Sequence, residues 1–189
     1  PQITVVDPAW NSNSGGMEYP TLFTGGARFF APEALQSPEG VTVHEAGHQF
    51  WYGLVGNNEF EEAWLDEGFN SYHEEKANWL WRGPASYGRY YFGPSGSRGA
   101  RTGLPYVARD IRYGRGGTSL PELRTLGKTD VMARKGWEYR TRDSYGLNSY
   151  GKPALSLQTL EALLGDETMT RVLRTYARRH RFSHPTSED

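Results

Sequence analysis

The feature that most constrains this chain of 189 residues is the segment His44-Glu45-Ala46-Gly47-His48, with eighteen residues between His48 and Glu67. The flanking segments Val41-Thr42-Val43 and Phe50-Trp51-Tyr52 are apolar, so we expect a buried helix here. Residues four apart on a helix share one face, with Cβ atoms roughly 5–6 Å apart, so both imidazoles leave on the same side. The fold must therefore bring two buried histidines together and give them partners.

Two histidines at this spacing are a zinc-binding pattern. Glu67 can supply a third ligand from a second helix, which leaves the fourth tetrahedral position open, as in catalytic zinc sites. Glu45 points about 100° away from the histidines, which suits it to take a proton from a water rather than to ligate. The alternative is a surface helix with two solvated histidines, which the apolar flanks disfavour because buried His and Glu need partners. The sequence therefore predicts one Zn²⁺ per chain, held by His44, His48 and Glu67.

Composition sets the wider limits. The chain is 37% hydrophobic and 14% aromatic, enough for a packed core, and its length fits one domain or one domain with a subdomain. It contains no cysteine, so disulfides and thiolate ligands are excluded. No stretch approaches the roughly 18 apolar residues of a membrane span, and no signal-peptide pattern is present. We expect no membrane span, and the compartment stays open between a cytoplasmic and a secreted parent.

The charge is unevenly distributed, although the net charge is only −1. Residues 1–81 carry 12 acidic and 2 basic groups, whereas residues 82–146 carry 5 acidic and 13 basic groups. Acidic surroundings favour a cationic metal and a cationic end of a substrate. The basic segment is interpreted as neutralising the acidic one within the fold, in preference to a nucleic-acid-binding patch, so we expect no nucleic-acid partner.

Apolar periodicity and turn residues predict the elements around the motif. Residues 3–6 and 17–23 are predicted strands, the second an edge strand near the site. Ser37-Pro38-Glu39 starts a helix that is expected to run to about Leu54. A second helix is expected from about Glu61 to Trp81, ending at Gly83-Pro84.

The second half of the chain is less regular. Residues 83–127 contain ten Gly and four Pro, which predicts a long loop with few regular elements. Residues 150–164 are apolar at helical spacing and stop at Gly165, and Asp166 is expected to cap a last helix that runs to about His180.

Four sequence elements, one of them divided into two segments, follow one another in an order that matches a known family. They are Gly15-Gly16-Met17-Glu18-Tyr19, the zinc-site segments 44–53 and 62–72, Tyr150-Gly151-Lys152-Pro153, and His184-Pro185-Thr186. Together they resemble the zinc aminopeptidases related to aminopeptidase N, a gluzincin family with the elements GxMEN, HExxH with a downstream Glu, and Tyr-x-Lys-Gly. Tyr19 stands where that family usually has Asn, and Pro153 where it usually has Gly.

The resemblance implies the same metal centre as the residues themselves. His44, His48 and Glu67 look like the zinc ligands, and Glu45 looks like the general base that activates water.

The resemblance also implies substrate-binding and oxyanion residues. Glu18 looks like the acid that pairs with the free α-amine of a peptide, and Gly15-Gly16-Met17 look like the backbone strip beside that peptide. Tyr150 looks like the hydroxyl that stabilises the tetrahedral intermediate together with zinc. Tyr145, five residues earlier, is a weaker candidate for that role.

The implied fold class is α+β: a thermolysin-like metallopeptidase catalytic domain, with a small β-sheet subdomain and a helical subdomain. We expect one partial domain over 1–189, truncated at both ends, because the chain opens on Pro1 and the family carries a β domain before this region and helical parts after it. The missing domains of the parent would then be partners. The expected parts are 1–36 for the sheet edge and substrate strip, 37–82 for the zinc-site helices, 83–145 for a long loop-rich segment, and 146–189 for C-terminal helices.

The expected activity is zinc-dependent hydrolysis of the N-terminal peptide bond of peptides with a free N-terminus. Two alternatives stay open at this point. Without the flanking domains an open cleft would admit internal bonds, which would make an endopeptidase. The chain would otherwise be an inactive, zinc-stabilised fragment that binds peptides.

Overall fold

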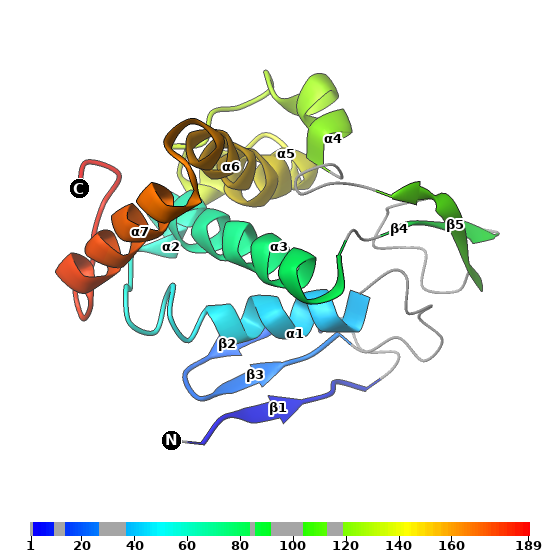
Figure 1. Cartoon of the computed structure of the whole chain (residues 1–189), viewed down its shortest axis with the longest axis horizontal. Helices are drawn as coiled ribbons and strands as arrows, with labels where there is room; N and C mark the ends of the chain where they lie inside the picture. Colours follow the sequence, from blue (N-terminus) through cyan, green and yellow to red (C-terminus); the bar gives the residue numbers. More distant parts are fainter. Residues whose placement is uncertain (1, 10–13, 27–36, 84–85, 92–103, 113–118) are drawn as a thin grey trace.

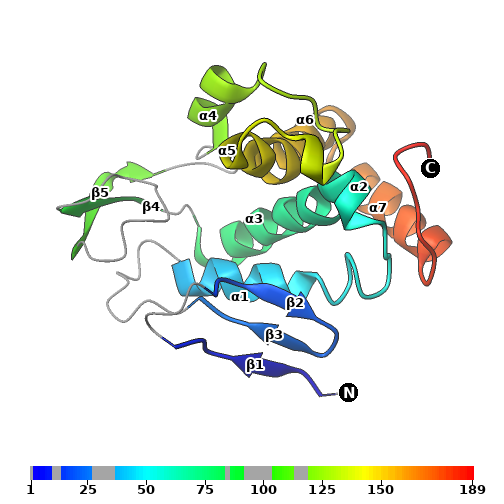
Figure 2. The same ribbon diagram turned by 180° about the vertical axis from the view of Figure 1, so that it is seen from behind.

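The computed structural model describes residues 2–9, 14–26, 37–83, 86–91, 104–112 and 119–189. It is mixed α and β, with a small three-stranded sheet beneath a stack of helices (Figure 1). Helix α1 (Ser37–Gly47) lies between the sheet and α3 (Phe69–Arg82), and α6 (Lys152–Leu164) packs on the other side of α3 (Figures 1 and 2). The architecture agrees with the predicted α+β class.

The sheet has the order β1-β3-β2, from β1 (Thr4–Val6), β2 (Met17–Tyr19) and β3 (Leu22–Thr24). β3 pairs in parallel with β1 and antiparallel with β2. The prediction of a strand at 3–6 is confirmed, but the prediction of one strand over 17–23 is wrong. The chain reverses at Pro20-Thr21, where Thr21 has a φ of 60°, and proline suits such a turn because it has no amide hydrogen to give to a ladder.

Helix α1 is described from Ser37 onward, and its regular turns end at Gly47 rather than near Leu54. The contact with α3 explains why glycine stands there, since a Cβ at Gly47 would lie 2.0 Å from Oδ1 of Asn70. The amide of Asn70 donates to the carbonyl of His44 at 2.7 Å. The turns that follow take Trp51 into the core, and they keep the bond from the His48 amide to the His44 carbonyl at 3.3 Å.

The predicted second helix is interrupted rather than continuous. It consists of α2 (Glu59–Ala63), a π-helical turn η2 (Trp64–Gly68) and then α3, with non-helical angles at Glu62. It ends at Gly83, whose φ of 77° favours glycine, close to where the sequence predicts the end.

A second π-helical turn, η4 (Leu147–Gly151), lies between α5 (Arg142–Gly146) and α6 and packs against η2. The predicted helix over 150–164 is therefore regular from Lys152, and it stops before Gly165, which has a φ of 81°. The last helix, α7, spans Asp166–His180, and Asp166 is its first residue rather than its cap.

The prediction of a long loop over 83–127 is wrong for most of the described part. Strands β4 (Ser86–Tyr91) and β5 (Leu104–Arg112) pair antiparallel, and α4 spans Ser119–Leu126. The tyrosines and β-branched residues of these segments favour strands, and this outweighs the glycine content. The rest of that prediction falls on 84–85, 92–103 and 113–118, outside the described residues.

The hydrophobic core lies where α3, α6 and α7 meet the turns after α1. Its buried members are Trp51, Val55, Leu65, Phe69, Tyr72, Ala154, Met169, Leu173 and Ala177. Among the described residues, no helix has both the length and the apolar character needed to cross a membrane.

The contact between η2 and the start of α6 gives a test of the packing. A Cβ at Gly68 would lie 2.5 Å from Cβ of Pro153, so Gly68→Ala should lower the free energy of unfolding by about 1–3 kcal/mol. The matched control is Gly146→Ala, at a helical glycine with no atom within 4 Å of the added Cβ, which should leave stability unchanged or raise it by up to about 1 kcal/mol. Urea unfolding followed by circular dichroism measures both, and equal midpoints would show that Gly68 and Pro153 do not pack this closely.

Candidate metal centre

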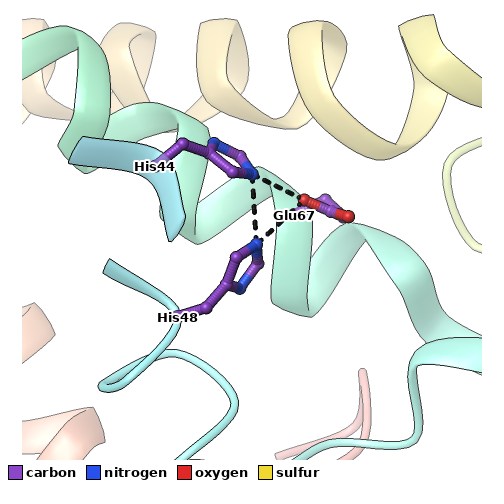
Figure 3. Close-up of side chains that lie close together, drawn as sticks. All are labelled: His44, His48 and Glu67. Atoms are coloured by element: carbon purple, nitrogen blue, oxygen red, sulfur yellow. Dashed lines mark hydrogen bonds and ion pairs between the residues drawn. The ribbon is translucent and has the colours of Figure 1, made fainter. Parts of the chain in front are cut away.

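The two histidines and Glu67 converge on one point (Figure 3). Nε2 of His44 lies 3.1 Å from Nε2 of His48, and Oε2 of Glu67 lies 3.0 Å from the first nitrogen and 3.3 Å from the second. His48 and Glu67 are buried and His44 nearly so. The structure therefore brings together the three ligands that the sequence predicts, from α1, from the residue after it and from η2.

The spacing of these three atoms fits one metal ion. Ligand atoms about 2.0–2.1 Å from a tetrahedral metal stand about 3.3 Å apart, close to the three measured distances. Two imidazole nitrogens and one carboxylate oxygen suit zinc or a first-row transition metal better than calcium or magnesium. In the described part of the chain, these residues form one of three groups with the spacing for a metal ion.

Two further carboxylates hold the imidazole rings in orientation. Nδ1 of His44 lies 3.0 Å from Oε2 of Glu74, and Nδ1 of His48 lies 2.9 Å from Oδ1 of Asp66. A ring nitrogen that donates to a carboxylate leaves the other nitrogen free to face a metal. Neither residue is among those predicted from the sequence. Helical spacing could have indicated Glu74, because it lies seven residues after Glu67, which is two helical turns along the same face.

The charges of the site are strongly coupled. Burial alone would lower the pKa of each histidine, but hydrogen bonds with Glu67 and Glu74 raise the pKa of His44 to about 9. Bonds with Asp66 and Glu67 raise the pKa of His48 to about 11. Burial would raise the pKa of Glu67, yet its bonds with both imidazoles lower it to about 2. Without a metal, these carboxylates therefore favour the protonated form of the two imidazoles.

Glu45 lies beside this centre, and one of its carboxylate oxygens lies within 4.8 Å of a ring nitrogen of His48. It is only 6% exposed, and no described residue donates a hydrogen bond to its Oε2. Burial raises its pKa to about 7, against the opposing effect of the two imidazoles. A Cβ at Gly16 would lie 1.9 Å from Oε1 of Glu45, so the glycine strip runs directly against this carboxylate.

Glu18 is the buried residue of the edge strand β2, only 7% exposed between the exposed Met17 and Tyr19. One carboxylate oxygen of Glu18 lies within 4.8 Å of ligand atoms of both Glu45 and His48. The strip before it is held to the sheet, because the hydroxyl of Thr24 donates to the carbonyl of Gly15 at 2.8 Å.

Tyr150 reaches the centre from the second π-helical turn. Its hydroxyl donates to Oε1 of Glu67, and its ring stacks on that of His44 with 5.8 Å between centroids. Burial and the nearby Glu67 raise the pKa of the hydroxyl, so it keeps its proton and stays a donor. Tyr145 lies further out, with its ring centroid 6.3 Å from that of Tyr150.

The structure adds one residue that no sequence pattern indicated. Glu59 is the first residue of α2, and one of its carboxylate oxygens lies within 4.8 Å of ligand atoms of both Glu18 and Glu67. Burial, together with Asp66 and Glu67, raises its pKa to about 7. The kink at Glu62 and the π-helical turn lie between Glu59 and Glu67, so helical spacing does not relate the two.

Comparison with known proteins gives a partial match to an aminopeptidase. No protein-family model matches the sequence. The chain is 26% identical, over 157 residues, to "Aminopeptidase 2, mitochondrial" of Saccharomyces cerevisiae; the match covers 83% of this chain and 14% of that protein. This similarity relates the chain to part of an aminopeptidase and supports a peptidase function at that general level.

The raised histidine pKa values predict how the protein takes up a metal. At pH 7 both imidazoles are protonated without a metal, and a metal needs each of them neutral, so Zn²⁺ binding should release about two protons per chain. Affinity should therefore rise with pH up to about pH 9–11, as the two protons become easier to remove. Calorimetric titration in buffers of different ionisation enthalpy counts the protons. Binding without proton release would contradict the protonated state of the centre.

Proposed function

We propose that this protein is a zinc-dependent aminopeptidase with a thermolysin-like fold, related to the aminopeptidase N family of gluzincins. The observation that carries the proposal is the convergence of His44, His48 and Glu67, with the buried carboxylate of Glu45 beside them and open to a donor. The match to part of a yeast aminopeptidase supports the same reaction class. The division into parts at 36/37, 82/83 and 145/146, and the partner domains of a longer parent, stay predictions.

The chemistry follows from the residues around the ligands. A bound Zn²⁺ would polarise the carbonyl of the substrate and lower the pKa of a water. Glu45 would accept the proton of the attacking water, since its Oε2 is buried without a donor among the described residues, and would pass that proton to the leaving amine. The hydroxyl of Tyr150 would turn from Glu67 to the oxyanion, where one such donor is worth about 3–4 kcal/mol.

The edge strand would align the substrate. In the described part of the chain, β2 pairs on one side only, with β3, so its other side offers backbone groups to an extended peptide. Glu18 would pair with the free α-ammonium of that peptide. This arrangement favours removal of the first residue over the endopeptidase alternative. The buried carboxylate of Glu18 would gain an ion pair from a charged terminus, whereas a neutral interior segment would cover it without supplying one.

The role of Glu45 has a direct test. Glu45→Gln removes the base but no ligand, so zinc content should stay at one ion per chain while kcat falls by about 10²–10⁴-fold. His48→Ala is the matched control, since it should lose the metal as well as the activity. Atomic absorption and hydrolysis of a peptide anilide measure the two properties. A Glu45→Gln protein with normal kcat would remove Glu45 from the mechanism.

The contact between Gly16 and Glu45 predicts a second effect on rate. A methyl group at Gly16 would displace the carboxylate of Glu45, which lies 1.9 Å from the position of the added Cβ, so Gly16→Ala should lower kcat by about 10²-fold with zinc retained. The control is Gly25→Ala in the same sheet, where the nearest atom to an added Cβ is 3.9 Å away and no change in kcat is expected. Equal kcat values for the two variants would show that Gly16 does not lie against the carboxylate of Glu45.

A further inference from the structure

Three carboxylates from separate elements meet at one side of the metal centre. Glu18 comes from β2, Glu59 from the start of α2 and Glu67 from η2, and one oxygen of each lies within 4.8 Å of the other two. We call these residues the carboxylate trio. Glu67 belongs to the metal ligands, whereas Glu59 has no part in the function proposed above.

Among the described residues, neither Glu18 nor Glu59 has a lysine or arginine partner. Glu18 is 7% exposed, and no described residue forms a hydrogen bond or an ion pair with its carboxylate. In the described part of the chain, no lysine or arginine pairs with Glu59 or Glu67 either; the nearby Lys135 pairs with Glu61 at 3.5 Å. A buried carboxylate without a partner is costly, so a cation from outside the chain would stabilise Glu18.

The spacing of the trio suits a primary ammonium group. An ammonium nitrogen has three tetrahedral N–H donors, and acceptors about 2.8 Å from it stand about 4.6 Å apart. The limit of 4.8 Å between the oxygens of the trio allows each N–H to reach one carboxylate. A blocked or acylated amine offers fewer donors and no charge.

We propose that Glu59 is a second substrate-binding carboxylate, which together with Glu18 receives the free N-terminal ammonium of the peptide and selects against blocked N-termini. This inference rests on the proposed aminopeptidase function and adds a residue to it. Glu67 would contribute the third acceptor while its other oxygen stays with the imidazoles. Glu59 thus sets specificity for the terminus, and the chemistry at the bond stays with Glu45.

The test compares Glu59→Gln with Glu61→Gln in the zinc-loaded chain. Glu61 lies on the same short helix but is exposed and paired with Lys135, so it is a matched control. The substrates are leucyl-4-nitroanilide and its N-acetyl derivative. Glu59→Gln should lower kcat/KM for the free amine by about 10–100-fold, mainly through KM, because a charge-assisted bond is lost. The kcat/KM for the acetylated substrate should not change, so the preference for a free amine should fall by the same factor. Glu59→Asp keeps the carboxylate and should restore part of this preference.

Binding of n-butylamine, measured by calorimetry with n-butanol as the uncharged comparison, tests the site without turnover. Glu59→Gln should weaken n-butylamine by the same factor and keep one zinc per chain. If Glu59→Gln left both the preference for a free amine and the affinity for n-butylamine unchanged, the inference would be overturned. It would also be overturned if the wild-type chain bound a second metal ion that Glu59→Gln loses, because the trio would then be a metal site. If the wild-type chain cleaves neither anilide, the proposed function fails, and n-butylamine binding that depends on Glu59 still supports the ammonium site.

Discussion

The three short distances between His44, His48 and Glu67 are the constraint on which the surrounding structure depends. Two imidazoles and a carboxylate in a largely buried space are stable only if each remaining hydrogen-bonding atom has a partner. Asp66 and Glu74 meet that need at the two Nδ1 atoms. Asp66 is a fully buried carboxylate in η2, and Glu74 is a partly buried carboxylate in α3. The need to pair the two imidazoles therefore explains why acidic residues stand on these two elements.

The two π-helical turns determine the direction of two side chains at the site. A π turn adds a residue to the helical repeat and turns side chains away from the face that a regular helix would give them, which is why such turns recur at functional sites. Glu67 lies in η2 and Tyr150 in η4, and the packing of one turn on the other brings their side chains into hydrogen-bond contact. Asp130 stabilises α5, the helix that leads into η4, since it accepts from the hydroxyl of Ser144 at 2.6 Å.

The sequence predicts what depends on local geometry and misses what depends on packing between distant segments. The pairing of His44 with His48 follows from helical spacing alone, and Glu74 follows from the same rule applied to Glu67. The place of Glu59 does not, because it depends on the kink at Glu62 and on the approach of β2. The early end of α1 has the same kind of cause, a close contact between Gly47 and a residue of α3 that follows 23 positions later in the chain.

The charge distribution connects the sequence to the chemistry of the site. The expected neutralisation of the acidic first part by the basic middle part occurs in the described residues at Arg82–Glu39 and Lys135–Glu61, and neither pair reaches the metal centre. The site therefore keeps a surplus of carboxylates in a medium of low polarity, where their field is least screened. The electric field of these carboxylates destabilises the folded protein when no cation is bound. The same field raises the concentration of cations near the site. A divalent metal and a cationic peptide terminus would neutralise the same carboxylates. Because two cations also repel each other, binding of one would weaken the electrostatic attraction for the other through the shared carboxylate of Glu67.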